Sequence, residues 1–332
     1  MDPLSQAVLG ASASQSIAQK ETIVVATIMG LLAGMSPDLD ALIRSPTDPL
    51  LFLEYHRQFT HSLIFIPFGA LICAAILHPL IGQKRGLQFR FSLLFCLIGY
   101  ATHALLDTCT TYGTQLFWPF SSQRLAWNTI SIIDPLFTLP VFGLVVLAAR
   151  KKLPVFGRFA LIWAIIYPTI GLLQRDRAEA IGWEIARERG HKPIQLEAKP
   201  SFGNLLLWKV VYETKEHFYV DAVRAGIKIK KFTGNSVQKL VIERDLPWLN
   251  LQSQQAKDIE RFRWFSNNYI AKDPKFPNRI IDIRYSMIPN QIDPLWSLQV
   301  SPEALVNQHA DYIVTRERSD SKLAIFKNML FY

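Results

Sequence analysis

The segment from Gly99 to Phe120 carries an imidazole and a carboxylate at a spacing that suits metal binding. His103 and Asp107 are four residues apart in an apolar stretch, so on a helix they lie on one face, one turn apart. Such groups are costly in an apolar helix unless they have a partner. A divalent cation satisfies both, because imidazole nitrogen and carboxylate oxygen both bind zinc. A hydrogen-bonded His–Asp pair that joins helices is the alternative interpretation of these two residues alone.

Further acids and imidazoles occur in the same half of the chain, beside apolar segments. Taken singly they have ordinary interpretations: Asp38 and Asp40 could form a turn, and Asp134 before Pro135 could cap a helix. Together they supply enough nitrogen and oxygen ligands for one or two divalent ions. The candidate metal ligands are Asp38, Asp40, His56, His61, His103 and Asp107.

A pair of residues beside these ligands could take part in phosphoester hydrolysis. Arg57, next to His56, has a guanidinium group that could hold a phosphate oxygen. Glu54 could be a spare ligand or a base. Two divalent ions about 3.5–4 Å apart can stabilise both the attacking and the leaving oxygen, and a bound metal lowers the pKa of water.

The elements that must position these residues are apolar helices. The pattern predicts six membrane crossings, several of them shorter than the ~20 residues of a full span. A shallow or re-entrant first pair of helices is an alternative. The predicted helices cover residues 4–19, 22–35, 62–81, 91–109, 130–149 and 159–173.

Positive charge in the first half is concentrated in two short loops, residues 83–90 and 150–158. Such loops are typical of the cytoplasmic side, so we expect every candidate residue to lie at the outer membrane face. A transporter is less favoured, because transporter sites usually lie near the bilayer midplane.

The composition changes after Leu173. We expect an amphipathic helix over residues 174–189, strands over 205–212, 218–229, 279–287 and 295–300, and a helix over 251–265. The predicted fold is an all-α multi-helix membrane domain (residues 1–173) followed by a soluble α+β domain (residues 174–332). By the same topology the second domain lies on the outer, periplasmic or extracellular, side of a bacterial inner membrane.

Composition argues against several other classes. The net charge is +9 over 332 residues, but no continuous basic stripe suggests a nucleic-acid partner. The three cysteines have no CxxC spacing, so neither a disulfide framework nor a thiolate zinc site is expected. No basic segment precedes an apolar core at the N-terminus, so we expect no cleavable signal peptide.

Over about residues 1–175 the chain resembles the bacterial membrane-bound metal-dependent hydrolases. The matching pieces are Gly34–Asp40, His56–Ser62, His103–Asp107, Tyr112-Gly113, Trp118–Phe120, Trp127 and Ile133–Pro135. The resemblance implies metal-site roles for the six candidate ligands and places Asp134 nearby, as a third catalytic candidate with Arg57 and Glu54. The His-x-x-x-Asp element is also distantly similar to that of the zinc-dependent phospholipase C and nuclease superfamily.

These features predict a metal-dependent hydrolase, with zinc as the expected ion and a membrane lipid or lipid-linked phosphoester as substrate. Members of the family often open with Thr-His where this chain has Ser5-Gln6, and Gln is a poorer ligand. A non-catalytic membrane scaffold or sensor with a structural metal or a polar cluster is therefore the alternative. The sequence identifies no protein partner.

Overall fold

The computed structural model describes residues 1–315 and 319–332, and the chain divides into two compact units. The first unit holds Met1–Ile43, Tyr55–Leu173 and Phe202–Asn204. The second unit holds Arg44–Glu54, Gln174–Ser201 and Leu205–Tyr332. The main division therefore falls between Leu173 and Gln174, and two short segments belong to the other unit.

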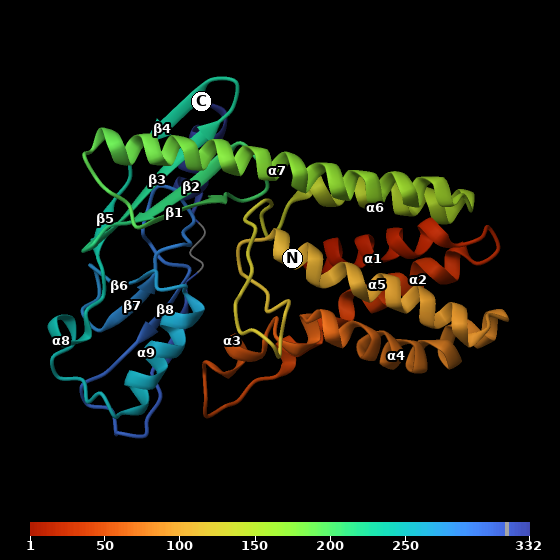
Figure 1. Cartoon of the computed structure of the whole chain (residues 1–332), viewed down its shortest axis with the longest axis horizontal. Helices are drawn as coiled ribbons and strands as arrows, with labels where there is room; N and C mark the ends of the chain where they lie inside the picture. Colours follow the sequence, from red (N-terminus) through yellow and green to blue (C-terminus); the bar gives the residue numbers. More distant parts are fainter. Residues whose placement is uncertain (316–318) are drawn as a thin grey trace. The chain divides into compact units, whose positions relative to one another are not determined.

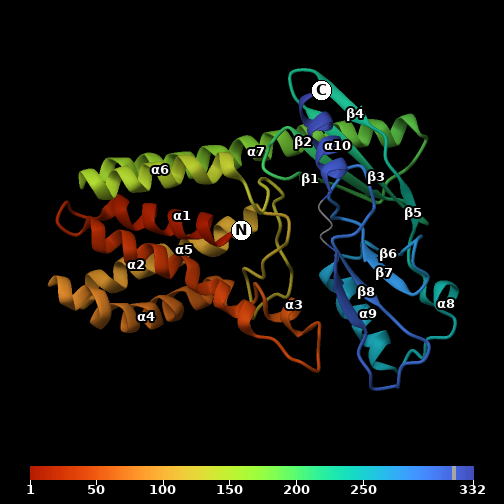
Figure 2. The ribbon, with the colours of Figure 1, turned by 180° about the vertical axis from the view of Figure 1, so that it is seen from behind.

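The first unit is built from apolar helices (Figure 1). They are α1 (Pro3–Ile17), α2 (Ile23–Met35), α4 (Ile66–Leu77), α5 (Phe89–Cys109), α6 (Pro135–Lys151) and the first part of α7 (Pro154–Glu188). Helix α1 packs against α2, α5 and α6, and α5 also packs against α2 and α4, as Figures 1 and 2 show from opposite sides. Asp38 and His61 lie on short helical turns outside this bundle. Asp38 lies on η1 (Ser36–Leu42) and His61 on η2 (Phe59–His61). The other short turns of the first unit are η3 (Leu63–Phe65), η4 (His78–Gly82) and η5 (Gln83–Arg85), whereas α3 (Leu51–Tyr55) falls mostly in the second unit.

Glycines allow α1, α2 and α5 to approach closely. A Cβ atom on Gly99 of α5 would lie 2.6 Å from the backbone oxygen of Gly30 on α2. A Cβ atom on Gly10 of α1 would lie 2.4 Å from the same oxygen. Such contacts are typical of membrane helices, in which small residues let the backbones touch. The packing fixes α5, which carries His103 one turn after Gly99.

Within the described residues, four helical segments have the length and composition to cross a membrane: Ile23–Leu42, Leu63–Arg85, Phe89–Cys109 and Pro154–Glu188. Helix α4 exposes apolar side chains along its length, including Phe68, Ile72 and Ile76. Helices α1 and α6 have 15 and 17 residues, so that they also cross stays a prediction.

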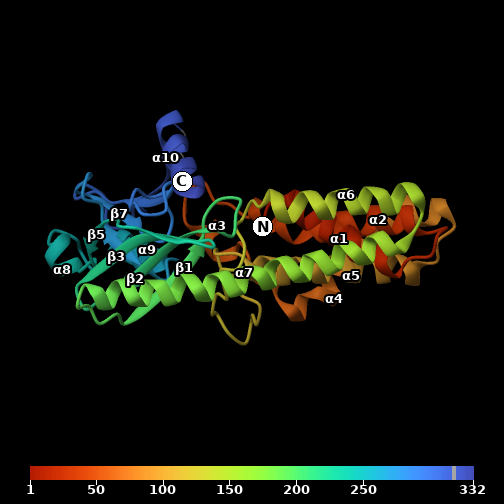
Figure 3. The same ribbon diagram turned by 90° about the horizontal axis from the view of Figure 1, so that it is seen from above.

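The second unit contains two antiparallel sheets and helices. One sheet has the order β1 (Gln195–Pro200), β2 (Leu207–Glu213), β3 (His217–Ala225), β4 (Ile229–Phe232), with β5 (Ser236–Gln238) also paired to β3. The other has the order β6 (Ile270–Lys272), β7 (Arg279–Asp282), β8 (Trp296–Gln299), β9 (Asp311–Val314). The helices are the last part of α7, α8 (Ile242–Asp245), α9 (Gln254–Phe265) and α10 (Asp320–Phe331), seen from above in Figure 3.

The core of the second unit explains why α7 stays helical in its polar part. Ala178, Ile181 and Ile185 recur at helical spacing and pack against Trp208 and Val223 of the first sheet. The two sheets share a further apolar cluster, formed by Val211, Phe218, Val220, Tyr269, Ala271, Ile281 and Ile283.

The predicted fold class is confirmed: apolar helices come first, and antiparallel sheets with helices follow. Two details differ. The predicted helices over 159–173 and 174–189 are one continuous helix, because the change in composition contains no residue that ends it. The predicted strand over 218–229 is β3, a turn and the start of β4. The sequence also missed β1, β5, β6 and β9.

Candidate metal centre

Four side chains from three elements bring one ligand atom each to a common point. Asp38 lies on η1, His61 ends η2, and His103 and Asp107 share one face of α5. His103 Nε2 lies 2.9 Å from His61 Nε2, and Asp38 Oδ1 lies 3.4 Å and 3.5 Å from these two nitrogens. Asp107 Oδ2 lies 3.3 Å from His61 Nε2 and 3.7 Å from His103 Nε2. We call these four residues the primary cluster.

The spacing of the four atoms suits one small divalent cation. Nitrogen and oxygen ligands at about 2.0–2.1 Å from a tetrahedral zinc ion lie about 3.3 Å from one another. The five distances given above run from 2.9 Å to 3.7 Å, on both sides of that value, and all four atoms lie within 4.8 Å of one another. The primary cluster could therefore hold a metal ion with little rearrangement of its side chains.

Hydrogen bonds orient both imidazoles toward this point. His103 Nδ1 lies 2.6 Å from the backbone oxygen of Gly34, which only accepts, so Nδ1 must donate. His61 Nδ1 lies 2.9 Å from Thr60 Oγ1, which gives its own proton to Asp40 Oδ2, so Nδ1 donates to this hydroxyl, and Asp40 Oδ2 lies 3.1 Å from the same nitrogen. In each neutral ring the lone pair is then on Nε2, the atom that faces the cluster. Such a carboxylate or carbonyl partner is the usual support of a metal-binding histidine.

The primary cluster is buried and rich in acceptor atoms. His61, His103 and Asp107 are at most 1% exposed. Asp107 Oδ2 forms no hydrogen bond within the described part of the chain, although ionic groups surround it. Burial by itself lowers the pKa of His61, but the neighbouring carboxylates of Asp107, Asp38 and Asp40 outweigh burial and raise this pKa to about 10. The surroundings therefore favour a positive charge at this point.

Gln6 reaches the cluster without entering it. Its Nε2 atom donates to Asp107 Oδ1 over 2.8 Å, and the amino group of Met1 contacts the same oxygen. The other amide atom, Gln6 Oε1, has no hydrogen-bond partner within residues 1–315 and 319–332. Gln6 thus holds one oxygen of Asp107 and leaves Oδ2 for the cluster.

Asp40 and His56 form a second group with Asp38, with ligand atoms that lie within 4.8 Å of one another. Asp40 Oδ1 lies 2.7 Å from His56 Nδ1. Asp40 Oδ2 accepts hydrogen bonds from the backbone nitrogen of Arg57 (2.9 Å) and from Thr60 Oγ1 (2.7 Å). Through these contacts Asp40 orients His61 and His56. A direct contact between Asp40 and a metal ion stays a prediction.

Arg57 is a buried member of the site and is 4% exposed. Its Nε lies 2.9 Å from Asp107 Oδ2, and its Nη1 donates to Thr110 Oγ1 over 3.1 Å. Its backbone has φ = 66°, a left-handed value that non-glycine residues rarely adopt. The guanidinium also lies over the Tyr112 ring, 4.9 Å from its centre. The structure thus brings Arg57 to the primary cluster.

The other two catalytic candidates belong to neither group. Asp134 caps α6: it accepts from the backbone nitrogens of Leu136 and Phe137 and from Tyr167 Oη, and burial raises the pKa of its carboxyl. Glu54 belongs to the second unit, where its carboxylate is paired with Arg261. These contacts give both residues structural roles.

Residues that orient the ligands were missed by the sequence reasoning. Thr60 links Asp40 to its neighbour His61, and Tyr100 Oη donates to the Thr60 backbone oxygen over 2.8 Å. Gly34 contributes only a carbonyl group, which no sequence pattern marks. A hydroxyl residue directly before a candidate histidine was the available signal for Thr60.

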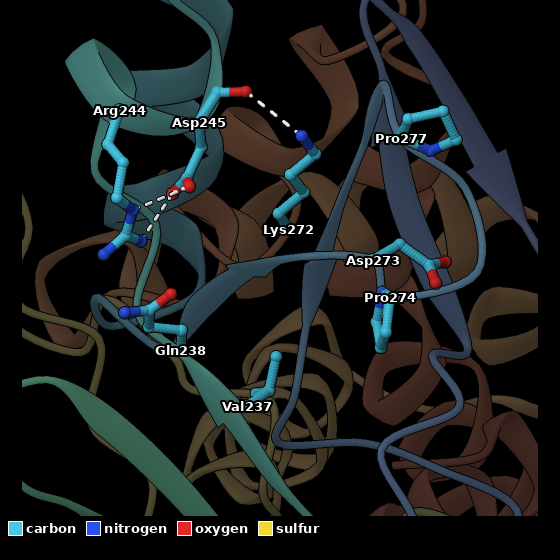
Figure 4. Close-up of a pocket in the computed structure, with 8 residues that line it drawn as sticks. All are labelled: Val237, Gln238, Arg244, Asp245, Lys272, Asp273, Pro274 and Pro277. Atoms are coloured by element: carbon cyan, nitrogen blue, oxygen red, sulfur yellow. Dashed lines mark hydrogen bonds and ion pairs between the residues drawn. The ribbon is translucent and has the colours of Figure 1, made fainter.

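The second unit has a polar surface pocket of about 340 Å³ (Figure 4). Figure 4 shows Arg244 donating to both oxygens of Asp245 and Lys272 donating to the Asp245 backbone oxygen. Its polar groups are thus largely bonded to one another, and it contributes to neither metal group.

The chain is similar to two bacterial proteins. It is 24% identical over 273 residues to "Uncharacterized protein YfhP" of Bacillus subtilis (strain 168), a match that covers 81% of this chain and 79% of that protein. It is 32% identical over 111 residues to "Inner membrane protein YbcI" of Escherichia coli (strain K12), covering 31% of this chain and 60% of that protein. No solved structure matches this chain.

A family model described as "YdjM inner membrane protein" matches residues 1–178. The matched region contains the candidate membrane-spanning helices, apart from the end of α7, and every residue of both metal groups. The family and the apolar helices together support a membrane location. The match covers more than half of the chain, which belongs to the YdjM inner membrane protein family.

Proposed function

We propose that this protein is a membrane-bound, metal-dependent hydrolase that cleaves a phosphoester of a lipid or lipid-linked substrate at the outer membrane–water interface. The observation that carries the proposal is the primary cluster, in which four buried ligand atoms converge and both imidazoles present Nε2. Two imidazoles and two carboxylates are a ligand set that zinc accepts. The similarity of the cluster motifs to metal-dependent hydrolases supports the same chemistry.

Asp38 belongs to both metal groups, so one carboxylate could bridge two ions. Two-metal sites are common in enzymes that hydrolyse phosphoesters. A bound divalent cation would act as a Lewis acid and lower the pKa of water. Asp40 and Thr60 would keep His61 oriented, and Arg57 would add positive charge beside Asp107, where a phosphate group needs it.

The surroundings of Asp38 favour a lipid substrate. Asp38 is the most exposed residue of the primary cluster, with a side chain that is 21% exposed. Leu39 and Leu42, on the same turn η1, are 63% and 77% exposed. Exposed leucines beside a partly exposed acid suit a molecule with an apolar chain and a charged headgroup.

The test is turnover by the full chain purified in detergent and supplied with zinc or manganese. Phospholipid vesicles and soluble phosphomonoesters and phosphodiesters are the probes. We expect phosphoester cleavage that is lost in His103→Gln and retained in His78→Gln. His78 is a matched control, because it bonds Ser92 in the same unit and belongs to neither metal group. Activity that survives in His103→Gln would contradict the proposal.

One observation favours a second function, a non-catalytic scaffold or sensor with a structural metal. Four protein ligands fill a tetrahedral site, whereas catalytic zinc sites keep a position open. A protein that binds metal, is inert on every phosphoester tested and unfolds at lower temperature after chelation would support this second function.

A further inference from the structure

The turn between β3 and β4 exposes an apolar side chain at its tip. Ile227 in the turn Gly226–Lys228 is 106% exposed relative to the extended reference, and Ile229 at the start of β4 is 51% exposed. Nearby Leu206 is 44% exposed, and its backbone oxygen accepts a hydrogen bond from Ala225. Apolar side chains that are exposed together can mark an interaction or membrane surface, and these three lie at the same end of the first sheet.

Hydrogen bonds hold this turn beside the start of the polar part of α7. Gln174 Nε2 donates to the backbone oxygen of Ala225 over 2.8 Å. Arg177 donates to the backbone oxygens of Ala225 (3.3 Å) and Gly226 (3.0 Å). All of these residues belong to the second unit.

This position lies at the end of a membrane-spanning segment. Gln174 directly follows Leu172 and Leu173, which are 37% and 62% exposed at the end of the apolar part of α7. A helix rises about 1.5 Å per residue, so Arg177 lies only about 6 Å along the helix beyond Leu173. The turn is therefore bonded to the residues of α7 that directly follow its apolar part.

Positive charge surrounds the exposed isoleucine. Lys228 and Lys230 are exposed, and Lys228 has no ion pair within the described residues. Lys230 donates to the Tyr332 backbone oxygen at the end of α10, which Figures 1 and 2 both show next to β4. Lys231 is paired with Glu184 and Glu188 of α7, so its positive charge is already neutralised within the protein.

We propose that the β3–β4 turn inserts Ile227 into the headgroup region of the bilayer that α7 crosses, while Lys228 and Lys230 contact anionic phospholipid headgroups. Apolar residues flanked by lysines bind membrane surfaces by this combination of burial and charge. A protein partner suits the surface less well, because a stable protein interface buries more than about 1,000 Å² and a single turn offers far less. The turn would anchor the second unit to the membrane.

The experiment places an environment-sensitive dye at the turn in the full chain, reconstituted into vesicles. Ile227→Cys is made in a background in which Cys73, Cys96 and Cys109 are alanine, and it is labelled with a nitrobenzoxadiazole dye. Ile194→Cys is the matched control, because Ile194 is 65% exposed but lies far from the turn along the sheet. Its backbone nitrogen donates to Glu213, at one end of β2, whereas the Leu207–Arg224 pair beside the turn is at the other end of β2. Vesicles contain phosphatidylcholine with or without phosphatidylglycerol, and a fraction of lipids carries a quencher near the headgroup.

We expect the dye at residue 227 to be quenched several-fold more than the dye at residue 194, most strongly in phosphatidylglycerol vesicles. The double change Lys228→Glu and Lys230→Glu should reduce quenching in phosphatidylglycerol and change it little in phosphatidylcholine. Equal quenching at 227 and 194 would overturn the proposal. A blue-shifted dye at 227 that lipid quenchers do not reach would indicate a protein partner and would also overturn it. The readout does not involve the metal groups, so it is independent of the proposed hydrolase function.

Discussion

The two carboxylate oxygens of Asp107 have different partners. Oδ1 accepts from Gln6 and contacts the Met1 amino group, whereas Oδ2 faces both imidazoles and Arg57. Partners behind a ligand orient it and typically change metal affinity by about 10–100-fold when they are removed. Gln6 is such a partner, because it donates to Asp107 Oδ1 behind the cluster.

We therefore expect Gln6→Ala to weaken zinc binding by about 10–100-fold without abolishing it. The measurement is competition with a chelator of known affinity, on detergent-purified protein. Gln15→Ala is the matched control, because Gln15 lies on the same helix but bonds Thr27 and the Val145 backbone oxygen. If the two variants bind zinc equally well, Gln6 does not support the primary cluster.

A second residue, Lys209, makes the stability of the second unit depend on pH. Burial lowers the pKa of Lys209 from 10.5 to about 7, and its amino group bonds Ser286 Oγ and the Gln291 backbone oxygen. Between these pH values the unfolded chain binds the proton and the folded chain does not, so the free energy of unfolding rises with pH. Below about pH 7 both states are protonated and this dependence ends.

We expect the unfolding temperature of the wild type to rise relative to that of Lys209→Met as the pH increases from 7 toward 10.5. Thermal unfolding of both proteins across this range measures the difference. Lys215→Met, at an exposed position, controls for the loss of a positive charge. A difference that stays constant, or shrinks with increasing pH, would show that Lys209 is charged in the folded protein.

At this scale, the residue types in the sequence identified the four members of the primary cluster as ligand candidates. They did not separate ligands from supporting residues, because that depends on which ring nitrogen faces the cluster. Asp40 and His56 illustrate the difficulty: the contact of Asp40 with His56 and its two hydrogen bonds from Arg57 and Thr60 depend on a turn geometry that spacing does not encode.

The packing of α5 against α2 positions His103 relative to Asp38. Gly99 touches the backbone of Gly30, where no flexible side chain can move aside. An added methyl group must therefore separate the helices or shift one along the other. Overpacking of this kind typically costs about 1–3 kcal/mol.

We expect Gly99→Ala to lower the free energy of unfolding by about 1–3 kcal/mol and to weaken metal binding, because His103 lies one turn further on the same face. Gly143→Ala on α6 is the control: its added Cβ would meet no atom within 4 Å. Thermal unfolding with and without zinc measures both effects. Equal behaviour of the two variants would show that the close approach of α2 and α5 does not position the cluster.

The bounds of a helix could be predicted from the sequence where its apolar pattern is uniform. They could not be predicted where the pattern changes from apolar to polar within one helix. Helix α5 is found at Phe89–Cys109, close to the expected 91–109. Helix α7 was predicted as two helices because its surroundings change at Leu173, although its backbone does not. Short strands such as β6, with three residues, carry too little periodicity to be recognised.

At the level of the whole molecule, the two units are not two continuous halves of the sequence, because the chain passes between them several times. Arg44–Glu54 belongs to the second unit, where Arg261 forms ion pairs with Asp48 and Glu54. Pairs this distant in sequence leave no local pattern. The segment lies in the chain between Asp40 and His56, so part of the second unit is inserted within the metal-site sequence.

We propose from the two basic loops that residues 174–332 lie outside the cytoplasm. An alkaline phosphatase fused after Leu173 should then be active, and a green fluorescent protein at the same position should be dark. Fusions within residues 150–158, in the second basic loop, should give the opposite pattern. A fluorescent fusion after Leu173 would reverse the orientation of both metal groups.

Elemental analysis of the detergent-purified full chain tests the central claim most directly. We expect a divalent metal, zinc foremost, to copurify with the wild type and with His78→Gln, and to be lost in His103→Gln and Asp107→Asn. The claim would be contradicted if the wild type carried no metal even after incubation with zinc, or if the two cluster variants kept as much metal as His78→Gln.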